Sequence, residues 1–323
     1  MDLLDIRDVS ITYKMPGKDV YAVQDVSLKV GEHESVGIVG ESGSGKSTLA
    51  MGILRLLPSN AETTGQALLE GQDILAMDEV QLRQVRWVKM AVVFQKAMNA
   101  LSPVHRIGTQ MEDIYLAHYP EASRQEIKDR IFELLKMMNL SERVYSSYPH
   151  ELSGGMMQRV AIALSLIFKP ELLIMDEATT ALDVVTQSQI LDEIMQLEKQ
   201  MHIARIMITH DVSVVASTCQ SVVVMYAGQL MESGAVTDVL VHPRHPYTQG
   251  LLKSFPSFNG ERGELRGIPG NLPDLSVKSG GCVFAPRCPF ADQRCRTSQP
   301  KLTAAGPGWQ TSCHHPLGGE PRG

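Results

Sequence analysis

The sequence predicts a layered α/β domain with an inserted helical segment and a loop-rich C-terminal extension. Short continuous apolar runs, such as residues 35–39 and 172–175, are typical of strands covered on both faces. Helical patterns separate these runs, and strands that alternate with helices indicate stacked layers. Residues 97–165 contain few strand signals. A chain of 323 residues is long enough for one large core and an appendage.

The N-terminal residues predict a pair of antiparallel strands. Residues 4–13 and 21–30 both alternate apolar and polar side chains. The pair Pro16-Gly17 lies between them, and these residue types favour a turn. We therefore expect an N-terminal hairpin.

A buried strand followed directly by a helix is predicted next. Residues 35–39 form a short apolar run that ends at a glycine-rich loop. The helix is expected to begin at about Lys46 and to stop near Leu57, because Pro58 cannot continue it.

Further buried strands are predicted at residues 91–94, 172–175, 204–209 and 222–226. Residues 186–201 predict a helix with one apolar stripe, formed by Ile190, Ile194, Leu197 and Met201. In the helical segment, Ser123 and Glu126 fit a capping box. Apolar residues follow at helical spacing: Ile127, Ile131, Leu134, Leu135 and Met138.

These patterns divide the chain into three predicted parts. The α/β core takes residues 1–95 and 166–234, and an antiparallel β subdomain belongs to it. The helical subdomain takes residues 96–165. The extension takes residues 235–323, which are rich in Pro and Gly and show little periodicity.

The composition is that of a globular protein, with 43% hydrophobic and 20% charged residues. A net charge of −6 argues against a broad nucleic-acid-binding surface. We see no apolar run near the ~20 residues that span a bilayer, and the N-terminus lacks a secretory signal pattern. We therefore expect a cytoplasmic protein whose membrane role comes through partners.

Residues 40–48 complete a phosphate-binding loop pattern between the predicted strand and helix. Glycines let successive backbone N–H groups face a phosphate chain, and the following helix N-terminus favours an anion. Lys46 is expected to reach the β- and γ-phosphates, and Ser47 to bind Mg²⁺. The predicted nucleotide-binding residues of this loop are Gly40, Ser42, Gly43, Ser44, Gly45, Lys46, Ser47 and Thr48.

A second acidic motif ends the predicted strand at residues 172–175. Asp176 is expected near the Mg²⁺. Glu177 follows at a position from which it can orient or deprotonate the attacking water, a role worth about 10²–10⁴-fold in rate.

The motif at residues 152–156, Leu-Ser-Gly-Gly-Met, has little use within its own site. With it, the chain resembles the nucleotide-binding subunit of an ABC transporter. In that family six motifs occur in fixed order, and here they are residues 40–48, 94–95, 152–156, 172–177, 181–183 and 209–211. The resemblance covers about residues 1–230. It implies a dimer in which Ser153, Gly154 and Gly155 bind the γ-phosphate of ATP held by the opposite subunit.

The resemblance also assigns roles to single residues. Gln95 would contact Mg²⁺ or the attacking water, His210 the γ-phosphate, and Asp183 would help to couple the two sites. An ordinary strand-end amide, an exposed histidine and a turn carboxylate are the alternatives. Tyr13 is the candidate for stacking on adenine, with a half-buried strand tyrosine as an equal alternative.

The C-terminal part contains two distinctive stretches: residues 242–248, His-Pro-Arg-His-Pro-Tyr-Thr, and residues 280–295, closed by Cys313-His314. With them, about residues 240–316 resemble the C-terminal segment of dipeptide and oligopeptide importers of the ABC class. Its cysteines, Cys282, Cys288, Cys295 and Cys313, have five, six and seventeen residues between them. Disulfides are disfavoured in a reducing cytoplasm, and four thiolates can hold zinc or an iron–sulfur cluster. The resemblance implies a 4Fe–4S cluster; Zn²⁺ and empty thiols remain the alternatives.

The predicted function is that of an ATP-hydrolysing subunit, at the cytoplasmic face of the membrane, that powers an importer of short peptides. Its expected partners are two membrane permeases, a related ATPase or a second copy, and an extracytoplasmic substrate-binding protein, but no nucleic acid. Nickel chelates and oligosaccharides are alternative solutes. A soluble ABC ATPase acting on nucleic acid or ribosomes is one alternative function, and a redox-regulated ABC protein is another.

Overall fold

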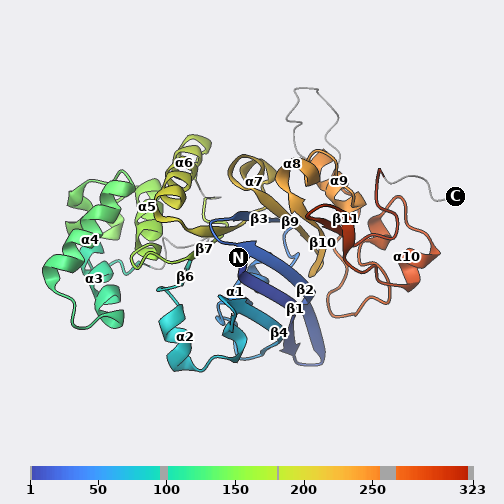
Figure 1. Ribbon diagram of the computed structural model, residues 1–323, viewed down its shortest axis with the longest axis horizontal. Helices are drawn as coiled ribbons and strands as arrows, with labels where there is room; N and C mark the ends of the chain where they lie inside the picture. Colours follow the sequence, from blue (N-terminus) through green and yellow to red (C-terminus); the bar gives the residue numbers. More distant parts are fainter. Residues whose placement is uncertain (1, 95–100, 180–181, 255–266, 319–323) are drawn as a thin grey trace. The chain divides into compact units, whose positions relative to one another are not determined.

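The computed structural model describes residues 2–94, 101–179, 182–254 and 267–318 (Figure 1). The chain forms two compact units. The first unit contains residues 1–76 and 207–323, and the second contains residues 77–206. Strand β8 (Ala204–Ile208) crosses the boundary between them. Within the described ranges, no helix combines the length and apolar character needed to cross a membrane.

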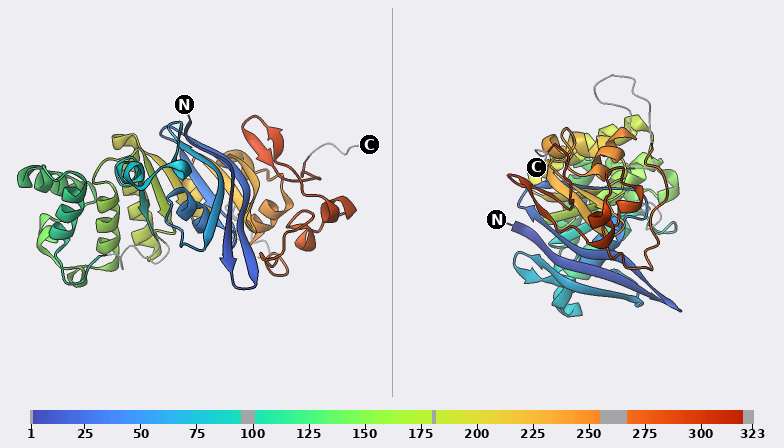
Figure 2. Two further views of the ribbon diagram at one scale, coloured as in Figure 1. Left: turned by 90° about the horizontal axis from the view of Figure 1, so that it is seen from below. Right: turned by 90° about the vertical axis from the view of Figure 1, so that its right-hand side faces the viewer.

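The first unit begins with the predicted hairpin. Strands β1 (Asp2–Met15) and β2 (Lys18–Gly31) pair antiparallel around the turn at Pro16-Gly17. β4 (Ala61–Leu69) pairs with the other edge of β1, and β5 (Gln72–Asp73) completes the order β2-β1-β4-β5. Figure 2 shows the two long strands side by side. The alternating pattern therefore predicted this hairpin correctly.

The predicted strand before the glycine-rich loop is β3 (Ser35–Val39), which is buried. It pairs parallel with β9 (Ser221–Tyr226), and β9 pairs antiparallel with β10 (Gln229–Ala235). Helix α1 (Lys46–Ile53) follows the loop. It ends before the predicted Leu57, because Leu54 closes it and Arg55 takes a left-handed conformation with a φ of 51°.

Two short strands of the extension were not predicted. β12 (Trp309–Thr311) pairs with β10, and β11 (Thr303–Gly306) pairs with β12. The remaining helices of the first unit are short: α7 (Val212–Thr218), α8 (Val236–Val239), α9 (Pro246–Lys253), α10 (Gln293–Thr297) and two 3-10 turns at Ile74–Ala76 and Ala285–Arg287.

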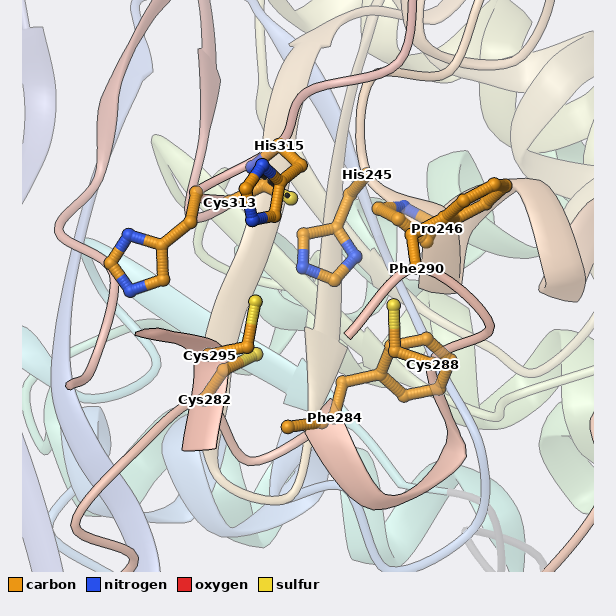
Figure 3. Close-up of a pocket in the computed structure, with 11 residues that line it drawn as sticks. His245, Pro246, Cys282, Phe284, Cys288, Phe290, Cys295, Cys313 and His315 are labelled. Carbon is orange, nitrogen blue, oxygen red and sulfur yellow. Dashed lines mark hydrogen bonds between the residues drawn. The ribbon is translucent and has the colours of Figure 1, made fainter. Parts of the chain in front are cut away.

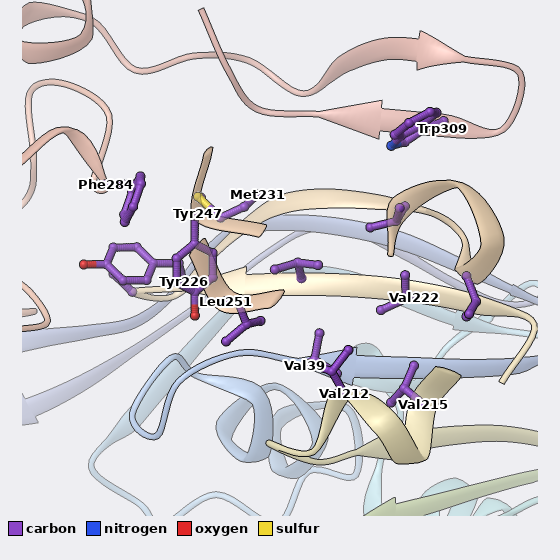
Figure 4. Packing of buried hydrophobic residues seen from close by; sticks show 14 of the residues in the cluster. Val39, Val212, Val215, Val222, Tyr226, Met231, Tyr247, Leu251, Phe284 and Trp309 are labelled. Carbon is purple, nitrogen blue, oxygen red and sulfur yellow. The ribbon is translucent and has the colours of Figure 1, made fainter. Parts of the chain in front are cut away.

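One apolar cluster joins the extension to the strand that precedes the glycine-rich loop. It contains Val39 of β3 together with Tyr226, Tyr247, Phe284 and Trp309 (Figure 4). The ring centroids of Tyr226 and Tyr247 are 4.6 Å apart, and each lies 5.3 Å from that of Phe284. The extension therefore shares a core with β3.

In the second unit, β6 (Met90–Val93) and β7 (Leu172–Asp176) pair in parallel, as expected for buried strands. The helices are α2 (Glu79–Val85), α3 (Ile107–His118), α4 (Arg124–Met137), α5 (Gly154–Ser165) and α6 (Val184–Met201), with 3-10 turns at Glu142–Ser146 and Pro149–Glu151. Ser123 caps α4 by accepting a hydrogen bond from the Glu126 N–H at 3.2 Å. The predicted apolar stripe of α4 is buried.

Candidate functional site

The glycine-rich loop between β3 and α1 depends on positions that only glycine can occupy. Gly40, Gly43 and Gly45 have φ angles of 154°, 80° and 97°. A Cβ on Gly40 would lie 2.1 Å from the Met225 carbonyl oxygen, and one on Gly45 would lie 2.4 Å from that of Ala22. The backbone therefore curls tightly enough to present its N–H groups to an anion.

Lys46 lies at the first position of α1 and is 5% exposed. Its Nζ donates to the carbonyl oxygens of Gly40 and Glu41, both at 2.9 Å. Gly45 is the N-cap residue of α1 and has no side chain that could compete for the N–H groups of the first turn. Ser42 and Ser47 are exposed at the same loop and turn. This arrangement provides a cation, backbone donors and hydroxyl groups for a phosphate chain.

In the second unit, β7 ends in the two predicted carboxylates. Asp176 is 8% exposed at the end of the strand. Glu177 is half-buried and has a φ of 49°, a conformation that non-glycine residues rarely adopt. Such backbone conformations cost about 1–3 kcal/mol and cluster at functional sites.

The structure brings the predicted signature residues together with Asp183. Ser153 caps α5 and is exposed, and Gly155 lies so close to α6 that an added Cβ would be 2.8 Å from the Thr186 Cγ2. Asp183 caps α6 by accepting from the Thr186 N–H at 3.0 Å and the Thr186 hydroxyl at 2.7 Å. These hydrogen bonds lower the pKa of Asp183. The starts of α5 and α6 therefore lie side by side.

The other predicted residues are placed separately. Tyr13 is half-buried on β1, opposite Val20 of β2 and Ala61 of β4. His210 is exposed after β8. Gln95 lies outside the described residues.

The four predicted cysteines of the extension line one pocket (Figure 3). Cys295 is buried and the other three are half-buried. The Cys282 N–H donates to the Cys295 carbonyl oxygen at 2.8 Å, which fixes two of the four residues against each other. None of the five cysteines forms a disulfide, and Cys219 lies apart from the pocket.

Burial raises the pKa of each thiol in the pocket, and that of Cys313 reaches about 12. Four neighbouring thiolates therefore need a bound cation to be stable. A smaller set of ligand atoms also occurs at the rim: oxygen of Asp292, sulfur of Cys295 and nitrogen of His315 lie within 4.8 Å of one another. The donor set of the pocket suits a soft metal centre.

His245 also lines this pocket and is 1% exposed. Its Nδ1 accepts a hydrogen bond from the Tyr247 N–H at 3.0 Å, so the ring proton lies on Nε2. Burial lowers the pKa of His245 to about 4, although the neighbouring Ser312 backbone opposes this effect. Nε2 is buried as well.

Sequence reasoning missed the charged groups that hold the extension. Glu232 of β10 is fully buried and accepts hydrogen bonds from the Arg244 N–H at 2.7 Å, the His245 N–H at 2.9 Å and the Trp309 Nε1–H at 2.9 Å. An acidic residue directly after the apolar pair Leu230-Met231 was the available signal. Arg287, which pairs with Glu41, gave no such signal.

Comparisons with known proteins agree with the geometry. The family described as ABC transporter matches residues 23–180, and the oligopeptide/dipeptide transporter C-terminal region matches residues 231–295. Over 317 residues the chain is 41% identical to the oligopeptide transport ATP-binding protein OppD of Salmonella typhimurium, across 98% of this chain and 94% of that protein. It is 45% identical over 319 residues to the probable D,D-dipeptide transport ATP-binding protein DdpD of Escherichia coli, across 97% of both chains.

Solved structures give the same result. The dimeric structure of a bacterial ABC transporter cassette matches with a TM-score of 0.65 and 31% identity, across 72% of this chain and 98% of the cassette. The dimeric post-hydrolysis state of that cassette, bound to ADP and Pi, matches with the same values. This chain is therefore an ABC-type ATPase and belongs to the family of ATP-binding proteins of oligopeptide and dipeptide ABC transporters.

Proposed function

We propose that this chain hydrolyses ATP to power the uptake of short peptides through membrane permeases. The observation that carries the proposal is the extension, which packs into one core with the strand before the phosphate-binding loop. The relatives that share this extension are named for oligopeptide and dipeptide transport. Nickel chelates and oligosaccharides are the alternative solutes.

We further propose the individual roles. The loop N–H groups and Lys46 bind the phosphates, Ser47, Asp176 and Gln95 hold Mg²⁺, Glu177 activates water and His210 contacts the γ-phosphate. Tyr13 stacks on adenine. The exposed Ser47 and the buried carboxylate of Asp176 support the Mg²⁺ assignment.

ATP closes two subunits on each other in this proposal, and residues 153–155 bind the nucleotide of the opposite subunit. The exposed cap of α5 supports this role, because N–H groups at a helix start bind anionic oxygen. The helical subdomain, residues 96–165, transmits the closure to two permeases at the cytoplasmic face of the membrane. The second ATPase is a related chain or a second copy, and an extracytoplasmic binding protein delivers the solute.

Replacing Glu177 by Gln tests the chemistry. We expect ATP hydrolysis to fall by about 10²–10⁴-fold while ATP binding is retained, because the amide cannot accept a proton from water. Asp192→Asn is the matched control, since Asp192 is exposed on α6. Hydrolysis by Glu177→Gln at the wild-type rate would remove Glu177 from this role.

We also propose that the four-cysteine pocket holds a 4Fe–4S cluster. The donor set fits, because four thiols line one pocket, which the buried His245 also lines. Bound there, such a group staples the extension and can take up one electron. Zn²⁺ is the alternative occupant.

Iron, sulfide and zinc should be measured on chain purified without oxygen. We expect about four irons per chain in the wild type, loss of iron and of visible absorbance in Cys288→Ser, and no change in Cys219→Ser, whose thiol lies apart. Stoichiometric zinc would replace the cluster assignment, and a metal-free wild type would end both.

The transport proposal is tested by purifying the tagged chain from its native membrane in mild detergent. Two permeases, an ATPase partner and a binding protein are expected by mass spectrometry, and the ligand of that binding protein identifies the solute. Ribosomal proteins or DNA without any membrane protein would contradict the proposal.

A further inference from the structure

Two side chains of the extension hold one residue of the phosphate-binding loop. The Arg287 Nη1 donates to both carboxylate oxygens of Glu41, at 3.1 and 2.9 Å. The Glu41 N–H donates to the Tyr247 hydroxyl at 2.9 Å. The Arg287 side chain is 6% exposed and that of Glu41 is 27% exposed, so water screens this pair only in part.

Arg287 is itself fixed on every side. Its Nε donates to the Pro269 carbonyl oxygen at 2.8 Å, its Nη2 to that of Ile268 at 2.9 Å, and its Nη1 also to the Tyr226 hydroxyl at 3.2 Å. The planar guanidinium group is suited to such fixed contacts, which an ammonium group cannot reproduce. Arg287 therefore presents a rigid positive charge to Glu41.

Glu41 in turn contacts the lysine that the nucleotide needs. Its carbonyl oxygen accepts a hydrogen bond from the Lys46 Nζ at 2.9 Å. Its carboxylate lies in the same loop, so without a partner its negative charge would repel the phosphates of ATP. Arg287 supplies that partner.

We propose that Arg287 is a positioning residue for ATP binding, which holds and neutralises Glu41. It thereby connects the four-cysteine segment, residues 282–313, to the phosphate-binding loop. Cys288, the next residue, lines the cysteine pocket. A change in the position of that segment would therefore move Arg287 and Glu41 and alter the binding of the nucleotide. The inference rests on ATP as the ligand of the loop, and it holds whatever the cysteine pocket contains.

The test is the dissociation constant of ATP for the full-length chain, measured without divalent cation so that no hydrolysis occurs. We expect Arg287→Ala to raise this constant about tenfold, because a charged hydrogen-bonded pair is broken beside the phosphates. The dissociation constant of Arg287→Lys should lie between those of the wild type and Arg287→Ala, since lysine keeps the positive charge but lacks the planar guanidinium group. Arg294→Ala, at an exposed arginine of the same segment, should bind as the wild type does.

A second substitution separates positioning from packing. Glu41→Gln combined with Arg287→Ala should restore ATP binding to within about threefold of the wild type, because the repelling charge is gone. Unchanged binding in Arg287→Ala would overturn the proposal. So would a double variant that binds as weakly as Arg287→Ala, since lost packing would then explain the effect. A wild-type chain that does not bind ATP would instead contradict the proposed function.

Discussion

The shape of the phosphate-binding loop is set by its own residues, whereas the position of the C-terminal extension is set by distant contacts. The loop is built from consecutive residues, and its shape comes from backbone that only glycine can adopt at Gly40 and Gly45. The C-terminal extension, which carries the cysteines, is held by a residue outside it: the carboxylate of Glu232 on β10 accepts hydrogen bonds from residues 244, 245 and 309. A contiguous site can be recognised as a motif, whereas a site held by distant partners leaves no local pattern.

The largest effect is expected from a substitution that distorts the phosphate-binding loop. Gly45→Ala should weaken ATP binding by at least about 100-fold, because its Cβ would lie 2.4 Å from the Ala22 carbonyl oxygen at a φ of 97°. ATP titration measures this. Gly267→Ala is the control, since its Cβ would meet nothing within 4 Å. Wild-type affinity in Gly45→Ala would show that the loop tolerates a side chain.

The second largest effect is expected from a substitution that removes the contacts of the C-terminal extension with β10. Glu232→Ala should lower the free energy of unfolding by about 2–4 kcal/mol, because two buried N–H groups and one partly buried N–H group lose their acceptor. Thermal unfolding and limited proteolysis after residue 235 measure it. Glu32→Ala, at an exposed position of the same unit, is the control. Equal stability of the two variants would mean that other contacts hold the extension.

The pH dependence of the unfolding free energy tests the role of Glu232 further. Burial raises the pKa of Glu232 above its ordinary value of 4.5, despite the hydrogen bonds that oppose this effect. The folded state therefore holds the proton more tightly than the unfolded state, so this group's contribution to stability falls as the pH rises above about 4.5. The difference in unfolding free energy between wild type and Glu232→Gln should follow this slope, and a difference independent of pH would contradict it.

The smallest effect concerns the surface of the extension. The Arg244 guanidinium lies 5.1 Å from the Trp309 ring centroid, and its Nη1 donates to the Leu317 carbonyl oxygen at 2.7 Å. Arg244→Met should cost about 1 kcal/mol of stability, because the methionine keeps the apolar contact but loses the charge. Differential scanning calorimetry can detect such a change, and a loss as large as that of Glu232→Ala would reverse the expected order.

Sequence reasoning predicted the parts of the fold whose pattern is local. The alternation of β1 and β2, the apolar run of β3 and the stripe of α4 all appear as expected. The end of α1 was missed because a left-handed Arg55 stops the helix before Pro58 does. Strands β11 and β12 are too short to show alternation, and they form because β10 offers an edge to pair with.

The anchors of the extension were missed for a similar reason. Glu232, Tyr247 and Arg287 act through partners that only the folded chain brings near. The cysteines themselves were recognised because their residue type is rare and clustered. Candidate ligand residues could thus be predicted from their residue type, whereas the residues that anchor them through tertiary contacts could not.

The pairing of β12 with β10 has a consequence for the newly made chain. During synthesis β10 is made first, and its edge stays unpaired until residues 236–308 and then β12 have been made. An unpaired strand edge is a template for pairing with other chains. A product that stops short of Trp309 would keep that edge open, so premature termination threatens the solubility of the ATPase even though every residue proposed to bind the nucleotide has already been made.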